Sequence, residues 1–202
     1  SPAVYRTFHF EHHRHTHDLE RDPEIASIPN YAGWPATGAQ WWRAALGDGM
    51  LRLKVALALP FATRPEIEWS LHGAWTTHIE DRAALARECR VLVACWALFL
   101  LAALWWLPGG GWLLLALWLA HVLQTWWLMC EHSGLPHHGS ILRRTRSVTS
   151  NAFVRFWLWN MNYHAEHHGW PSIPWHRLPE AHAEVAPHLE ALAPGYIAQH
   201  RS

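Results

Sequence analysis

Residues 91–107 have the sequence VLVACWALFLLAALWWL, and residues 112–130 have the sequence WLLLALWLAHVLQTWWLMC. The four residues between them, 108–111, are PGGG. Both long segments lack charged residues, and each approaches the roughly 20 apolar residues with which a helix crosses a bilayer. The proline and the glycines between them cannot continue a helix without a large cost in free energy. The sequence therefore predicts a transmembrane hairpin of two helices, and the alternative is a pair of buried helices in a soluble core.

The basic residues beside this hairpin predict its orientation. Six arginines flank the two segments outside the turn: Arg82, Arg87, Arg90, Arg143, Arg144 and Arg146. The turn itself contains no basic residue. Because positively charged loops stay on the cytoplasmic side of a membrane, we expect both outer ends of the hairpin to face the cytoplasm.

The overall composition narrows the class of protein. The chain has 202 residues, a length typical of one domain, so we interpret residues 1–202 as a single domain. Its 16 Lys and Arg balance 16 Asp and Glu, and this neutrality argues against a nucleic-acid partner. Three scattered cysteines offer no disulfide framework. The 18 histidines and 16 tryptophans are the unusual feature.

The segments outside the hairpin are less apolar. Residues 41–62 carry apolar side chains mostly three and four residues apart, which favours an amphipathic helix in the membrane interface over a short, imperfect span. Residues 22–40 contain three prolines and two glycines and indicate a loop, whereas residues 66–90 indicate a membrane-peripheral helix. We therefore expect an all-α fold, an integral membrane bundle of helices.

The pattern HxxHH occurs near both ends of the chain. Its histidines are His9, His12 and His13 in the N-terminal box and His164, His167 and His168 in the C-terminal box. On a helix, positions i, i+3 and i+4 lie on one face, so each box presents three imidazoles in one direction. Neutral imidazole is a ligand for iron, zinc, copper and nickel, and the two boxes therefore predict metal binding.

A further histidine, His132, follows the second apolar segment directly. Because a hairpin returns the chain to the side that it left, we expect both boxes and His132 to meet on one membrane face, as a cytoplasmic, histidine-rich, metal-binding cap. The side chains expected to orient the rings by accepting hydrogen bonds are Glu11, Asp18, Glu131 and Glu166. His121 lies on the same helical stripe as His132, and it either lines a substrate tunnel or bonds a backbone carbonyl.

The other histidines have weaker patterns. His15 and His17 are interpreted as loop residues, with ligation in place of a missing histidine as the alternative, and His137 and His138 as loop residues. Six more are isolated by their spacing and are expected to be structural or at the surface: His72, His78, His176, His182, His188 and His200.

Several motifs together resemble the membrane fatty acid desaturase and hydroxylase superfamily. They are the two boxes, Asn162-Tyr163 before the C-terminal box, the segments PSIPW at 171–175 and Leu178-Pro179 after it, and HRHTHD at 13–18 with Asp22-Pro23. The resemblance covers nearly the whole chain. It implies a non-haem centre of two irons, held almost entirely by histidines at the cytoplasmic membrane face, which uses O2 to oxidise a C–H bond of a lipid.

Carried over residue by residue, the resemblance makes the six box histidines and His132 the metal ligands, with no other catalytic or cofactor-binding side chain. It implies a fatty acyl substrate and desaturation, with hydroxylation or ketolation of a lipid or carotenoid-like substrate as the alternative. No dinucleotide-binding motif is present, so electrons are expected from a separate ferredoxin, rubredoxin or cytochrome b5-type protein. A zinc hydrolase is disfavoured because HExxH is absent.

The sequence departs from the family pattern in two ways. The family's first box, HxxxH or HxxxxH, has no counterpart, since only eight residues precede His9, so we expect an N-terminally truncated or shortened homologue. Leu128 stands where some family members have an asparagine. These departures leave open a second hypothesis, a non-catalytic remnant that retains part of the metal site.

Overall fold

The computed structural model describes residues 1–29, 32–34, 37–64, 76 and 79–201. It comprises two compact units. The N-terminal unit consists of Ser1–His15, Glu20–Asn30 and Pro35–Trp126, and the C-terminal unit of Thr16–Leu19, Tyr31–Trp34 and Trp127–Ser202. Helix α7 begins in the N-terminal unit and ends in the C-terminal unit.

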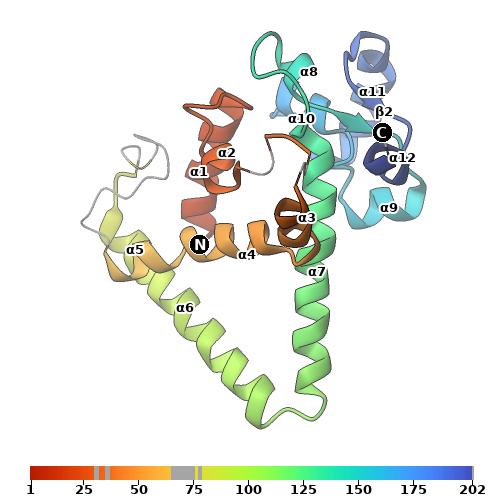
Figure 1. Ribbon diagram of the computed structural model, residues 1–202. Coiled ribbons are helices and arrows are strands. Elements are labelled where there is room, and N and C mark those ends of the chain that lie inside the picture. The colour runs from red at the N-terminus through yellow and green to blue at the C-terminus, as the bar shows by residue number, and fades with distance from the viewer. Residues whose placement is uncertain (30–31, 35–36, 65–75, 77–78, 202) are drawn as a thin grey trace. The chain divides into compact units, whose positions relative to one another are not determined.

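The N-terminal unit is helical throughout its described secondary structure (Figure 1). Its elements are α1 Pro2–His15, α2 Pro23–Ser27, α3 Gly38–Ala45, α4 Asp48–Ala56, α5 Leu59–Thr63, α6 Arg82–Trp105 and α7 Gly110–His132. The long pair α6 and α7 confirms the expectation of two apolar helices. Only 11% and 17% of their most apolar stretches are buried, whereas a core helix of a soluble protein is mostly buried. Both are long and apolar enough to cross a membrane.

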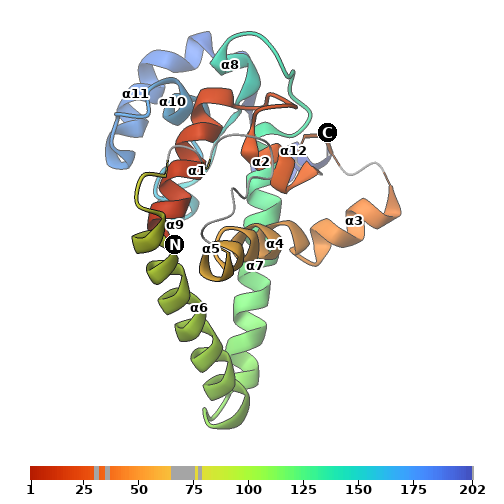
Figure 2. The same ribbon diagram turned by 90° about the vertical axis from the view of Figure 1, so that its left-hand side faces the viewer.

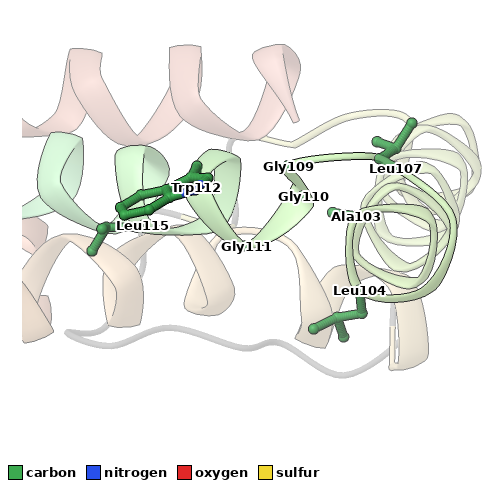
Figure 3. Close-up of a pocket in the computed structure, with 8 residues that line it drawn as sticks. All are labelled: Ala103, Leu104, Leu107, Gly109, Gly110, Gly111, Trp112 and Leu115. Carbon is green, nitrogen blue, oxygen red and sulfur yellow. The ribbon is translucent and has the colours of Figure 1, made fainter.

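The turn between α6 and α7 depends on glycine. Gly109 has φ +75°, in the left-handed region that favours glycine. A Cβ atom on Gly110 would lie 1.8 Å from the carbonyl oxygen of Ala103, so the two helices approach too closely there for any side chain. Figure 3 shows Gly109 and Gly110 beside Ala103, in an open apolar hollow that Leu107 and Trp112 also line.

Residues 41–62 form parts of three short helices, α3 to α5, instead of the single helix predicted. The first break is at Gly47, which has φ +68° and whose Cβ would lie 2.9 Å from the backbone of His121. The second break precedes Pro60, whose ring cannot continue a helix from the preceding turn. The amphipathic pattern of residues 41–62 gives no information about the close contact between Gly47 and the backbone of His121, so the pattern did not predict this break.

The predicted loop at residues 22–40 contains α2 and the start of α3. Asp22 caps α2 by accepting a hydrogen bond from the amide of Glu24, and Thr37 and Gln40 form a capping box at α3. Such caps stabilise short helices next to prolines. Of the helix predicted at 66–90, residues 66–75, 77 and 78 lie outside the described residues, and α6 begins at Arg82.

The C-terminal unit surrounds a small parallel sheet. After the end of α7, its elements are α8 Ile141–Arg144, β1 Ser147–Val148, α9 Ala152–Trp157, α10 His164–Gly169, η3 Trp175–Arg177, α11 Leu178–Val185, η4 Ala186–His188, β2 Leu192–Ala193 and α12 Tyr196–Arg201. Ser147 pairs with Leu192 and Val148 with Ala193. Helix α10 packs against α8 and α11, as Figure 1 and Figure 2 show. This sheet is the one departure from an all-α fold among the described residues.

Candidate metal centre

In the N-terminal unit, helix α1 carries the three histidines of the N-terminal box on adjacent turns. The Nε2 atoms of His9 and His13 lie 3.1 Å apart, and the centres of these two rings are 4.5 Å apart. The ring of His12 lies 5.9 Å from each of the other two. The helical spacing thus brings the imidazoles together locally.

His12 is held by carboxylates from α2 and its cap. Its Nδ1 atom lies 2.9 and 3.0 Å from the two carboxylate oxygens of Asp22, and its Nε2 atom lies 3.4 Å from Glu24. Burial favours the neutral ring, but the charges of Asp22 and Glu24 outweigh it and raise the pKa of His12 to about 9. Without a metal, this imidazole is therefore protonated at neutral pH.

In the C-terminal unit, three buried histidines converge from α7 and α10. These are His132, His164 and His168, which we call the buried trio. The Nε2 atoms of His132 and His164 are 2.9 Å apart, and the ligand atoms of the trio lie within 4.8 Å of one another. Two elements far apart in sequence thus supply one compact group of nitrogens.

The other ring nitrogen of each histidine in the trio faces a hydrogen-bonding group. Nδ1 of His132 donates to the carbonyl of Arg144 at 3.0 Å, and Nδ1 of His164 lies 3.3 Å from Glu131. Nδ1 of His168 lies 3.0 Å from the hydroxyl of Thr16. Such contacts fix the orientation of metal-binding imidazoles and leave Nε2 for the metal.

His167 lies outside the buried trio although it belongs to the same box. It is half-buried on α10, and its ring centre is 5.9 Å from that of His164 and 5.6 Å from that of His168. Because consecutive helical residues are rotated by 100°, His167 and His168 point in different directions from α10. The C-terminal box therefore does not direct all three rings to one point within this unit.

The nitrogen separations fit ligands of a shared metal ion. With metal–nitrogen bonds of about 2.0–2.1 Å and angles of about 90–109°, two neighbouring imidazole nitrogens are separated by about 2.8–3.4 Å. The Nε2 pairs His9–His13 and His132–His164, at 3.1 and 2.9 Å, fall in this interval. A donor set of neutral imidazoles suits iron, zinc or copper.

A profile described as "Fatty acid desaturase" matches residues 1–200. The chain belongs to the fatty acid desaturase family. This match confirms the resemblance found in the motifs, and desaturases of this family are oxidoreductases known for di-iron sites. No curated protein and no solved structure was found to match the chain.

The structure confirms only some of the orienting carboxylates that were expected from the sequence. Glu131 contacts His164, as expected. Glu166 instead contacts Ser147 and His182, and Glu11 contacts Arg14 and His15. His182, expected to be structural or at the surface, is thus half-buried and bonded to a carboxylate of the C-terminal box.

Two orienting residues, Asp22 and Thr16, were missed by sequence reasoning. The sequence Asp22-Pro23 is a recognisable signal for a helix cap, but nothing in it indicates that Asp22 also binds His12. Thr16 contacts His168, which is 152 residues away in the sequence, and no local sequence pattern predicts such a contact.

Several other histidines make structural contacts. His17 donates from Nδ1 to the carbonyl of Pro136, and His137 donates from Nδ1 to the carbonyl of His17, so the two residues join their loops. His121 bonds the carbonyl of Leu117 at 2.6 Å, which matches the backbone-carbonyl alternative for this residue. His72 and His78 lie outside the described residues.

Proposed function

We propose that this protein is a membrane-bound, non-haem di-iron oxidoreductase that uses O2 and electrons from a separate carrier protein to desaturate a fatty acyl or similar lipid chain. The observation that carries the proposal is the pair of HxxHH boxes, with nitrogens at ligand separations in each unit, in a chain of the desaturase family. The proposed ligands are His9, His12, His13, His132, His164, His167 and His168.

The assignment of these seven histidines to a single centre of two irons follows from the family. The buried trio supplies three imidazoles, and His167 and the N-terminal box supply the others. Thr16, three residues after His13, belongs to the C-terminal unit and contacts His168. The chain thus passes directly from the N-terminal box to a residue that orients the trio, which supports a common role.

The bound irons would supply the redox chemistry and the O2-binding positions that no side chain offers for breaking an unactivated C–H bond. The chain's own residues hold and orient the imidazoles. Glu131, Thr16 and the carbonyl of Arg144 hold the trio, and Asp22 holds His12. Zinc would fit the same nitrogens but has no redox activity.

Membrane insertion of α6 and α7 follows from the free energy of exposing them to water. Fifteen large apolar side chains of these helices and their turn are exposed. Leaving each of these side chains in water instead of an apolar environment costs up to about 1.5–3 kcal/mol, so the total cost of exposing them to water is on the order of tens of kcal/mol. A whole domain is stable by only about 5–15 kcal/mol. The arginines outside the turn favour a cytoplasmic location for the histidines.

Product analysis after reconstitution into membranes tests this proposal. With O2, a reductant and a carrier protein, we expect an isotope-labelled fatty acyl lipid to lose two hydrogens, whereas a hydroxylase would add one oxygen. His167→Ala should abolish the product, and His188→Ala, an exposed residue of η4, should retain it. Equal product from wild type and His167→Ala, or no O2-dependent product from any acyl lipid, would contradict the proposal.

A further inference from the structure

Exposed aromatic side chains lie on α9 and on the segments that follow it in the C-terminal unit. We call these side chains the aromatic patch; its members are Phe153, Phe156, Trp157, Trp159 and Trp175. Their side chains are exposed by 71%, 73%, 66%, 63% and 45%, in that order. Exposed apolar groups of this kind are uncommon on soluble proteins and mark a surface that binds something apolar.

The local structure holds these rings in two groups, one on α9 and one at the turn that follows it. Phe153 and Trp157 are four residues apart on α9, and their ring centres are 6.2 Å apart. Trp159 and Asn160 then adopt left-handed φ angles of +51° and +58°, which are rare for residues other than glycine. Asn160 donates to the carbonyl of Trp175, and the rings of Trp159 and Trp175 lie 5.5 Å apart. The turn thus places two tryptophans next to each other at the surface.

The charges of this segment favour a phospholipid partner. Residues 149–177 contain a single carboxylate, Glu166, which is buried against Ser147 and His182. The same segment contains Arg155, within α9, and Arg177 at the end of η3. The guanidinium of Arg177 forms an ion pair with Glu180 at 2.6 Å, so Arg155 carries this argument. Tryptophan and phenylalanine next to basic side chains are typical of surfaces that enter the head-group region of a bilayer, where the basic groups meet lipid phosphates.

We propose that the aromatic patch inserts into the head-group region of a phospholipid bilayer, with lipid as its partner. The C-terminal unit also contains residues 127–132, the end of α7, so this unit is joined directly to a helix that is apolar enough to cross a membrane. The proposal goes beyond the oxidation chemistry. It rests on the proposed function only through membrane insertion of the hairpin.

Site-specific fluorescence in phosphatidylcholine vesicles tests the proposal. An environment-sensitive dye is attached to Phe156→Cys in a Cys95→Ser background, because Cys95 is the one exposed native cysteine among the described residues. The matched control carries the dye at Glu184→Cys, an exposed position on α11 of the same unit. A third sample carries it on native Cys95 in α6 and reports insertion of the hairpin itself.

We expect the dye at residue 156 to show a blue shift and to lose most of its emission when nitroxide lipids are added, with no change at residue 184. Quenching at Cys95 but not at residue 156 would overturn the patch proposal and leave membrane insertion intact. A blue shift at residue 156 without lipid quenching would also overturn it, because protein would then cover the patch. No quenching at Cys95 would overturn membrane insertion and, with it, this proposal.

Discussion

The hydroxyl of Thr16 lies 3.0 Å from Nδ1 of His168, and both side chains are buried in the C-terminal unit. The carbonyl of Thr16 accepts a hydrogen bond from the guanidinium of Arg144 at 2.7 Å. The carbonyl of Arg144 in turn accepts from Nδ1 of His132. One threonine and one arginine therefore fix the Nδ1 atoms of two of the three histidines in the trio.

Removing the Thr16 hydroxyl should weaken metal binding. In Thr16→Val the shape is kept but the hydrogen bond to His168 is lost, so we expect the affinity for iron or zinc to fall about 10–100-fold, the usual effect of losing a residue that orients a metal ligand. Competition with a chelator measures this change. Thr16→Ser keeps the hydroxyl and should bind metal as the wild type does. Equal affinities in all three proteins would show that Thr16 does not orient His168.

Asp22→Asn separates the charge of Asp22 from its role as a helix cap. Asparagine caps a helix as well as aspartate does, so α2 should persist. The pKa of His12, raised to about 9 by Asp22 and Glu24, should fall in the metal-free variant because one of the two carboxylates is gone. Titration of isotope-labelled histidine by NMR measures the change, and an unaltered pKa would contradict the assigned cause.

The contact between His12 and Asp22 also predicts how the stability of the metal-free protein depends on pH. The pKa of His12 is higher in the folded protein than its ordinary value of 6.5. The contact between protonated His12 and Asp22 therefore contributes fully to the free energy of unfolding below pH 6.5. This contribution is lost as the pH rises through about 9. Thermal unfolding should show a smaller loss of stability over this range in Asp22→Asn than in the wild type. Equal losses would argue against a contribution from this contact.

Alanine substitutions at the hairpin turn offer a matched comparison. Gly110→Ala places a methyl group 1.8 Å from the carbonyl oxygen of Ala103, so we expect a destabilisation of about 1–3 kcal/mol or more. Gly111→Ala meets no atom within 4 Å and should be neutral or stabilising by up to about 1 kcal/mol. Denaturation in detergent distinguishes the two variants, and equal stabilities would mean that the helices do not approach as closely at Gly110.

The sequence predicted those features that depend on neighbouring residues. Uninterrupted apolar runs on both sides of PGGG indicated α6 and α7, and the spacing in HxxHH indicated that His9 and His13 share a helix face. The same spacing did not predict that His167 lies outside the buried trio. Features that depend on distant residues were not predictable. The break at Gly47 depends on the backbone of His121, and the placement of His168 depends on Thr16. Neither contact leaves a periodic pattern in the chain.

Iron content per chain tests the central claim most directly. Protein purified in detergent from cells supplied with iron should contain two irons per chain, and His132→Ala and His9→Ala, one from each unit, should each lower that content. His188→Ala should leave it unchanged. Full iron content in both ligand variants, or zinc in place of iron in the wild type, would contradict a di-iron centre built from the two histidine boxes.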